Sequence, residues 1–140
     1  MEVFQVDDAG QLFISPAIDD WQVLVRHEVD TVIDLDGDLD NGVPTVPNQW
    51  LYIYFPIFDE DLPNLAKLQA IGDLGARIIT SGHRVLSHCG MGFNRSALVA
   101  GVILNKLGMA GPDAVRRLRE RRPGALFNEC FAAYLESLQK

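Results

Sequence analysis

The sequence predicts a three-layer α/β domain in which a mainly parallel sheet lies between two layers of helices. Runs of β-branched and aromatic residues alternate along the chain with longer segments of helical periodicity. Such alternation is typical of parallel strands joined by right-handed helical crossovers. The 140 residues, 48% of them hydrophobic, suffice for one core, and no internal repeat or long linker divides them. We therefore expect residues 1–140 to form a single domain.

Five strands are expected, each a short run rich in Val, Ile, Leu, Tyr or Phe that ends at turn residues. They lie at residues 3–6, 11–14, 31–35, 50–55 and 84–88. The segment 36–49 is acidic and rich in Gly, Pro and Asn, which indicates a surface loop.

Five helices are expected between and after these strands, at residues 16–28, 63–80, 96–107, 111–121 and 127–138. Ser15 and Pro16 offer an N-cap and a first helical residue for the first helix. Pro63 opens the second helix. Its predicted apolar face consists of Leu65, Leu68, Ile71, Leu74 and Ile78.

Charge and composition narrow the classes of partner and the cellular setting. The net charge of −7 argues against nucleic acid or an anionic membrane as a partner. The start of the chain lacks the pattern of a signal peptide, and the longest apolar stretch, 97–107, is too short to span a membrane. Two cysteines, Cys89 and Cys130, are too few for a disulfide framework. We expect a cytoplasmic protein; the sequence does not predict its oligomeric state.

The segment 85–99, VLSHCGMGFNRSALV, carries the pattern of an anion-binding site. A strand delivers Cys89 to the carboxyl edge of the sheet, where ligands bind in such folds, and a helix starts at about Ser96. Backbone amides at a helix N-terminus and the helix dipole attract an anion. Gly90 and Gly92 are expected to supply the positive φ values that such a loop needs.

Arg95 completes this predicted site, because its planar guanidinium can hold two oxygens of one phosphate. The amides and Arg95 also favour the thiolate form of Cys89, so a nucleophile would lie at the bottom of the anion site. His88 is expected to fix the shape of the loop by hydrogen bonding. The Ser96 hydroxyl is expected to donate to the sulfur and to ease its departure.

The stretch 88–96, HCGMGFNRS, resembles the HCxxGxxRS signature of the dual-specificity group of protein-tyrosine phosphatases. The segment 55–59, FPIFD, followed by Pro63, resembles the general-acid loop of that group. Arg122 and Pro123, followed by Asn128, resemble its C-terminal Arg-Pro segment. These matches cover most of the chain, from about residue 30 to residue 138.

The resemblance implies the cysteine-based phosphatase fold and its chemistry. Cys89 would attack phosphorus and form a phosphocysteine, which Ser96 would help to break down. Asp59 would protonate the leaving oxygen and then activate water; Asp61 stays open as an alternative. Arg95 and the loop would bind the phosphoryl group, and no cofactor or metal is expected. The residues that would bind the phosphate of the substrate are Gly90, Met91, Gly92, Phe93, Asn94 and Arg95.

The resemblance also implies a substrate class, a phosphoprotein that carries phosphotyrosine, with phosphoserine and phosphothreonine left open. The chain lacks the tryptophan and the additional recognition loops of larger tyrosine phosphatases, which favours a shallow cleft. The loop has no lysine, which disfavours a phosphoinositide or another small phosphoester as the substrate but leaves both open as alternatives. Two other classes stay open: a rhodanese-like sulfurtransferase and a phosphoprotein-binding module without turnover.

Three further patterns have a structural and a functional interpretation. Cys130 lies on a predicted helical stripe, so we expect it in the core, with a redox partnership to Cys89 as the alternative. The arginines of 116–122 predict a solvated helix face, or else a brace for the phosphate loop through Arg122. The alternating aspartates of 34–40 lack the glycine and glutamate of a calcium loop and indicate an acidic turn.

Overall fold

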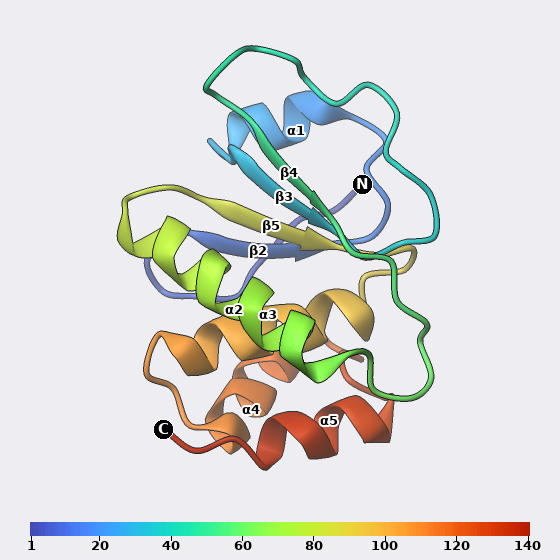
Figure 1. Cartoon of the computed structure of the whole chain (residues 1–140), viewed down its shortest axis with the longest axis vertical. Helices are drawn as coiled ribbons and strands as arrows, with labels where there is room; N and C mark the ends of the chain where they lie inside the picture. Colours follow the sequence, from blue (N-terminus) through green and yellow to red (C-terminus); the bar gives the residue numbers. More distant parts are fainter.

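Five strands form one sheet with the order β1-β2-β5-β3-β4 in the computed structural model, which describes all 140 residues (Figure 1). The strands are β1 (Phe4–Gln5), β2 (Leu12–Ser15), β3 (Thr31–Asp34), β4 (Leu51–Tyr54) and β5 (Val85–His88). The β2–β5, β5–β3 and β3–β4 pairs are parallel, and only the short β1 is antiparallel to its neighbour. The predicted mainly parallel sheet is confirmed.

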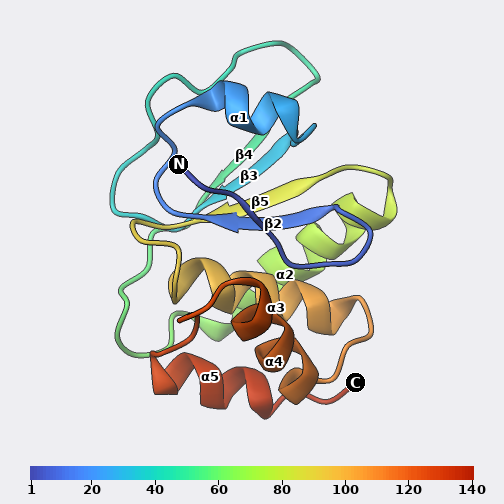
Figure 2. The same cartoon turned by 180° about the vertical axis from the view of Figure 1, so that it is seen from behind.

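Five helices cover the two faces of the sheet unequally. They are α1 (Trp21–Arg26), α2 (Leu65–Thr80), α3 (Arg95–Lys106), α4 (Gly111–Arg121) and α5 (Glu129–Glu136). Helix α1 lies alone on one face, α2 and α3 lie on the other, and α4 and α5 pack outside α3 (Figures 1 and 2). The three-layer α/β prediction is therefore confirmed. None of these helices combines the length and the hydropathy needed to cross a membrane.

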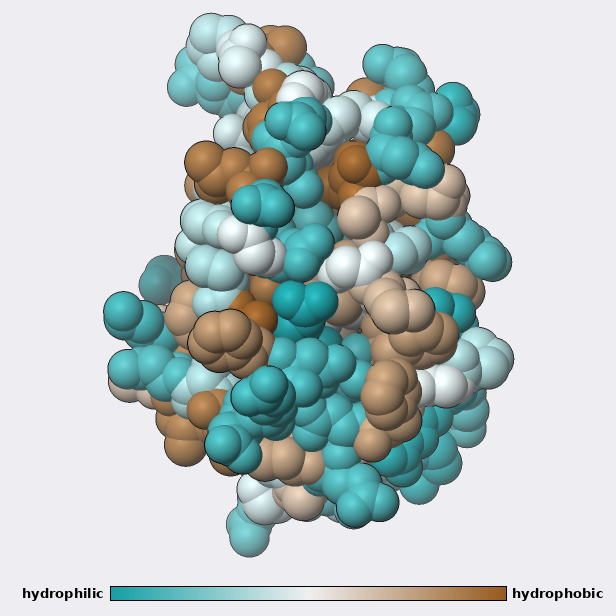
Figure 3. Space-filling model, turned by 90° about the vertical axis from the view of Figure 1, so that its right-hand side faces the viewer, coloured by the Kyte–Doolittle hydropathy of each residue, from teal (hydrophilic) through white to brown (hydrophobic).

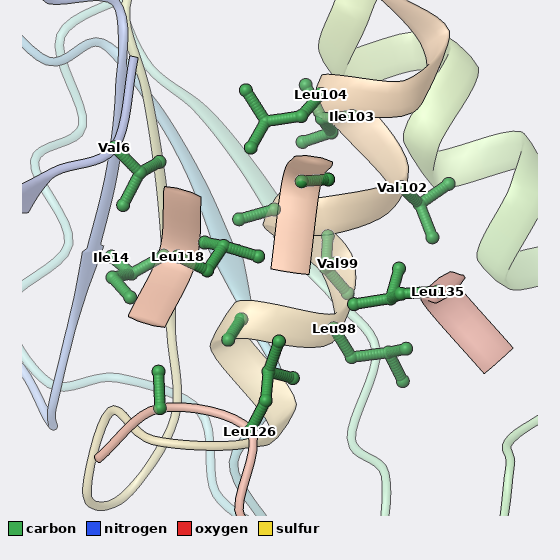
Figure 4. Close-up of a cluster of buried hydrophobic side chains, with 14 of the residues drawn as sticks. Val6, Ile14, Leu98, Val99, Val102, Ile103, Leu104, Leu118, Leu126 and Leu135 are labelled. Carbon is green, nitrogen blue, oxygen red and sulfur yellow. The ribbon is translucent and has the colours of Figure 1, made fainter. Parts of the chain in front are cut away.

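The main core lies between the sheet and the helices α2 to α5, with α3 at its centre (Figure 4). Nine consecutive residues of α3, Ser96–Leu104, are buried, so this helix has no solvent face over most of its length. Its N-terminus points to the carboxyl edge of the sheet. A smaller cluster, which includes Phe13, Leu24 and Leu86, fills the space under α1. Strand β5 contributes Val85 to the main cluster and Leu86 to the smaller one, so the strand that leads into the loop 89–94 is packed on both faces.

The first helix starts later than its sequence indicated, at Trp21 rather than residue 16. Ser15 is not an N-cap: it is the last residue of β2 and pairs with His88 of β5. Its hydroxyl donates to the carbonyl of Pro16. The cap is Asp20, whose side chain accepts from the Gln22 amide. Continuation of the parallel ladder through Ser15 outweighs the local capping signal.

Helix α2 begins at Leu65, capped by Asn64, and its buried face is rotated from the predicted one. Leu68 is buried as expected, but Leu65 and Leu74 are 43% and 39% exposed. The face that packs on α3 carries glycines instead: a Cβ at Gly72 would lie 2.4 Å from Val102. Close approach of the two helices therefore decides the orientation of α2.

The prediction that Cys130 lies in the core is wrong. Helix α5 begins at Glu129, its side-chain cap is Asn128, and Cys130 is a free, exposed thiol. The helix instead buries the side chains of Phe131 and Leu135 against the core. The predicted stripe included Phe127, which precedes the helix and is 67% exposed. The buried face of α5 consists of Phe131, Ala132 and Leu135, which leaves Cys130 exposed to solvent.

Candidate active site

The loop between β5 and α3 encloses the thiol of Cys89. Strand β5 ends at His88 and α3 begins at Arg95, so the loop spans only 89–94. Cys89 is 2% exposed. The Gly92 amide donates to its Sγ at 3.3 Å, and Ser96 Oγ lies 3.5 Å from the same sulfur. The loop thus brings a backbone amide and a hydroxyl to the sulfur at its floor.

Gly92 and Gly90 serve the loop in different ways. Gly92 has a φ of 76°, and a Cβ there would lie 2.7 Å from the backbone nitrogen of Pro16. Both the conformation and the contact require glycine. Gly90 does not have a positive φ, so that prediction is wrong. A Cβ at Gly90 would instead lie 3.3 Å from Arg95 Nη2, so the missing side chain leaves room for the guanidinium.

Arg95 is held at the mouth of the loop by the segments that follow β3 and β4. Its Nη1 lies 3.4 Å from three acceptors: the carbonyl oxygens of Leu35 and Ile57 and the carboxylate of Asp36. Its side chain keeps 18% of its surface exposed. These contacts use one nitrogen of the guanidinium and leave the others for a ligand. The sequence did not indicate a role for Asp36, because no pattern in residues 34–40 shows that Arg95, 59 positions later in the chain, will contact it.

Asp59 is tied to the phosphate loop by two side-chain amides. One of its carboxylate oxygens accepts from Asn94 Nδ2 and the other from Asn128 Nδ2, both at 2.8 Å. Asn94 Oδ1 in turn accepts from the Asn128 backbone amide at 2.9 Å. Asn94, predicted among the phosphate-binding residues, thus directs its side chain to the candidate acid. The carboxylate of Asp61 makes no such contact and faces a hollow within its own loop.

Arg122, the residue that follows α4, also contacts the phosphate loop. Its guanidinium stacks between two rings, 3.9 Å from the centroid of Phe93 and 4.4 Å from that of Phe4. It donates to the carbonyl oxygens of Gly92 and Met91, each at 3.3 Å. Of the two interpretations of the arginine cluster, the contacts of Arg122 fit the brace. The side chain of Met91 is 70% exposed beside it.

His88 lies behind the loop in a buried polar cluster. Its Nε2 lies 2.6 Å from Asp40 Oδ2, and its Nδ1 has no partner. The Tyr52 hydroxyl donates to Asp34 and accepts from the Asp40 amide at 2.9 Å. Burial raises the pKa of Asp40, and burial with the hydrogen bond to Asp34 raises the pKa of Tyr52. His88 therefore anchors the acidic loop 36–49 to the base of the phosphate loop.

The same cluster has some geometry of a metal site. Ligand atoms of Asp34, Asp40 and His88 lie within 4.8 Å of one another. Both oxygens of Asp34, Asp40 Oδ2 and His88 Nε2 already have hydrogen-bond partners within the protein. Hydrogen bonding therefore accounts for the arrangement.

The site thus has a buried thiol in a short loop, with a helix N-terminus behind the loop and the first residue of that helix, Arg95, beside Gly90. Comparison with known structures supports the fold. The chain superimposes on a variant of human DUSP28 with a TM-score of 0.81 and 22% identity, over 97% of this chain and 94% of that one. The human tyrosine phosphatase-like serine/threonine/tyrosine-interacting protein gives a TM-score of 0.76 and 22% identity, over 96% and 93% of the two chains.

The sequence itself is similar to one curated phosphatase. Over 120 residues it is 29% identical to a protein phosphatase Slingshot homolog of Xenopus laevis. The match covers 83% of this chain but only 17% of that relative, which is a much longer protein. No protein-family model matches the chain. The resemblance to the dual-specificity phosphatases, and the fold that it implied, are confirmed.

Proposed function

We propose that this chain is a phosphoprotein phosphatase that acts through a phosphocysteine, with residues 1–140 as one catalytic domain. The observation that carries the proposal is the buried Cys89 thiol, whose sulfur accepts from the Gly92 amide at 3.3 Å. An electrophile that fits this site is an anion that a thiolate can attack, and a phosphomonoester meets both conditions. The similarity to a Slingshot phosphatase supports a phosphoprotein as the substrate.

The proposed reaction has two steps. Cys89 Sγ attacks phosphorus, an S–P bond forms, and the P–O bond to the leaving group breaks as Asp59 donates its proton to that oxygen. Water then attacks the phosphocysteine, Asp59 takes the proton of the water, and the S–P bond breaks with release of phosphate. Arg95 and the loop amides stabilise the transferring phosphoryl group in both steps. The Ser96 hydroxyl stabilises the thiolate that departs in the second step.

Our proposal extends to the setting of the enzyme. A cysteine nucleophile has to stay reduced, and a reducing cytoplasm keeps thiols in that state. Both cysteines are free thiols. The groups named above supply every proton and charge of the two steps, so we propose that no metal or cofactor takes part. Tyrosine is the leading phosphorylated residue, with serine and threonine as further substrates.

A binding module without turnover is the rival to this function. One similar structure is that of a protein named as tyrosine phosphatase-like and interacting. Hydrolysis of an aryl phosphate by wild type and by Cys89→Ser, both with EDTA, decides between the two. Turnover that is lost in Cys89→Ser supports the phosphatase. A folded, reduced wild type that binds phosphopeptide without turnover would establish the binding module.

A further inference from the structure

The loop between β4 and α2, on which Asp59 lies, curves around a hollow. The hollow is lined by residues 55–58 and 60–64. Most of its walls are apolar, with Phe55, Ile57 and Leu62 among them, and two exposed carboxylates, Glu60 and Asp61, complete the lining. Neither carboxylate is paired with a cationic side chain of this chain. The site thus combines apolar walls with uncompensated negative charge.

This hollow begins next to the proposed phosphate site. Ile57 lines the hollow, and its carbonyl accepts from Arg95 at 3.4 Å. Asp59, two residues on, faces the other way and bonds to Asn94. The backbone of the loop at Ile57 therefore lies between the hollow and Arg95. A peptide whose phosphorylated side chain reaches Cys89 can place a neighbouring side chain in the hollow.

The charge on this side of the cleft has one sign. The segment 36–64, which supplies the loops after β3 and β4, contains no Lys, Arg or His. It carries six carboxyl side chains, those of Asp36, Asp38, Asp40, Asp59, Glu60 and Asp61. The nearest guanidinium, that of Arg95, already contacts Asp36. A second anionic group on a substrate would be repelled here, whereas a cationic one would be attracted.

We propose that the hollow is a substrate subsite for a lysine or arginine side chain close in sequence to the phosphorylated residue. Such side chains bury an aliphatic stem and keep a cationic head at the surface, which matches apolar walls next to Glu60 and Asp61. Figure 3 looks onto this edge of the molecule, where apolar and hydrophilic side chains lie side by side. The inference rests on the proposed phosphatase function and specifies its substrates as phosphopeptides with basic flanks.

The test uses phosphotyrosine peptides of one sequence, in which a single flanking position is lysine, norleucine or glutamate. The position is moved through the residues on both sides of the phosphotyrosine. At low ionic strength we expect kcat/KM for the best lysine peptide to exceed that of its norleucine counterpart by about 2- to 5-fold, the range of an exposed ion pair. The glutamate peptide should be the poorest, and added salt should reduce the differences.

The carboxylates are tested by the double variant Glu60→Gln, Asp61→Asn, with Glu136→Gln, an exposed carboxylate of α5, as the matched control. The ratio of kcat/KM between lysine and norleucine peptides, taken within each variant, should fall towards one in the double variant and persist in the control. An equal rate for both peptides in wild type, or a ratio unchanged in the double variant, would overturn the subsite. An assay with aryl phosphate distinguishes the two proposals. If aryl phosphate is hydrolysed but the peptides show no lysine preference, only the subsite is overturned. If aryl phosphate is not hydrolysed, the phosphatase function is overturned as well.

Discussion

Asp59 accepts a 2.8 Å hydrogen bond from the side-chain amide of Asn94, a residue of the phosphate loop itself. The other oxygen of the carboxylate accepts from Asn128, at the start of α5. The proposed acid is thus oriented by two amides from segments far apart in the sequence. Since proton transfer requires the donor to lie within hydrogen-bond reach of the leaving oxygen, this orientation should be visible in the kinetics.

Asn128→Ala should lower kcat for phenyl phosphate by about 10-fold, the equivalent of one hydrogen bond to a charged group. The leaving group of phenyl phosphate is a weak acid and needs a well-placed proton. A dinitrophenyl phosphate leaves without that help, so its kcat should change little. Steady-state kinetics with both substrates measures the difference. Equal losses for the two substrates would show that Asn128 acts on the fold and not on Asp59.

Asp59→Asn should lower kcat for phenyl phosphate by roughly 10²- to 10⁴-fold, the usual contribution of a general acid. Asp61→Asn should leave kcat for this small substrate within about 2-fold, because the Asp61 carboxylate has no contact with the phosphate loop. The two variants are measured side by side. The reverse pattern would move the acid role to Asp61.

Arg122→Ala should weaken the binding of inorganic phosphate, measured as a competitive inhibitor. It removes two donors to loop carbonyls and the stacking on Phe93, each worth about 0.5–1.5 kcal/mol. Arg116→Ala is the control, since that side chain is exposed and pairs only with Asp113 on its own helix. An inhibition constant that is the same in both variants would contradict a bracing role.

Gly92→Ala should abolish turnover or unfold the loop, because a Cβ would strain the φ of 76° and lie 2.7 Å from Pro16 N. Gly82→Ala is the control that has the backbone strain without the close contact. Gly82 has a φ of 95°, but nothing lies within 4 Å of its added Cβ. We expect Gly82→Ala to cost about 1 kcal/mol of unfolding free energy and to keep its activity. Full activity in Gly92→Ala would contradict the close approach.

Asp40→Asn should alter how stability depends on pH. Burial raises the pKa of Asp40 above its ordinary 3.8, so folding favours the protonated carboxyl. The stability that this group contributes is complete below pH 3.8 and is lost as the pH rises through the folded value. The amide of the variant does not titrate, although His88, Asp34 and Tyr52 still face the position.

Urea unfolding across pH measures this difference. Wild type should lose stability relative to Asp40→Asn from about pH 4 upwards, because only wild type carries the buried group that ionises there. A stability difference that is constant, or that grows in favour of wild type as the pH rises, would contradict the raised pKa.

The fold was predictable because its signals are local. β-branched runs placed all five strands within one or two residues, and helix α4 begins and ends as expected. The rotation of α2 was not predictable, since it depends on Gly72 meeting Val102 of another helix. The start of α1 was missed because a strand pairing at Ser15 overrode a capping signal.

For the candidate site, too, the local features were predictable and the long-range contacts were not. Cys89, Gly92, Arg95 and Ser96 belong to one continuous motif, whose spacing alone places them at one junction between a strand and a helix. The partners of these residues come from distant segments: Asp36 on Arg95, Asp40 on His88 and Asn128 on Asp59. No local pattern indicates which acidic residue of a loop will face which basic one. The resemblance already favoured Asp59 over Asp61, and the folded arrangement adds the contacts of Asp59 with Asn94 and Asn128.

The central claim is that phosphate passes through Cys89, and trapping the intermediate tests it most directly. In Asp59→Asn a dinitrophenyl phosphate still phosphorylates the thiol, whereas the loss of the base slows hydrolysis of the product. The variant is mixed with this substrate, quenched in acid and digested for mass spectrometry. We predict one phosphate on the peptide that contains Cys89, and none when Cys89→Ser is added to the variant. Turnover with no phosphate on Cys89, or with phosphate on another residue, would contradict the account.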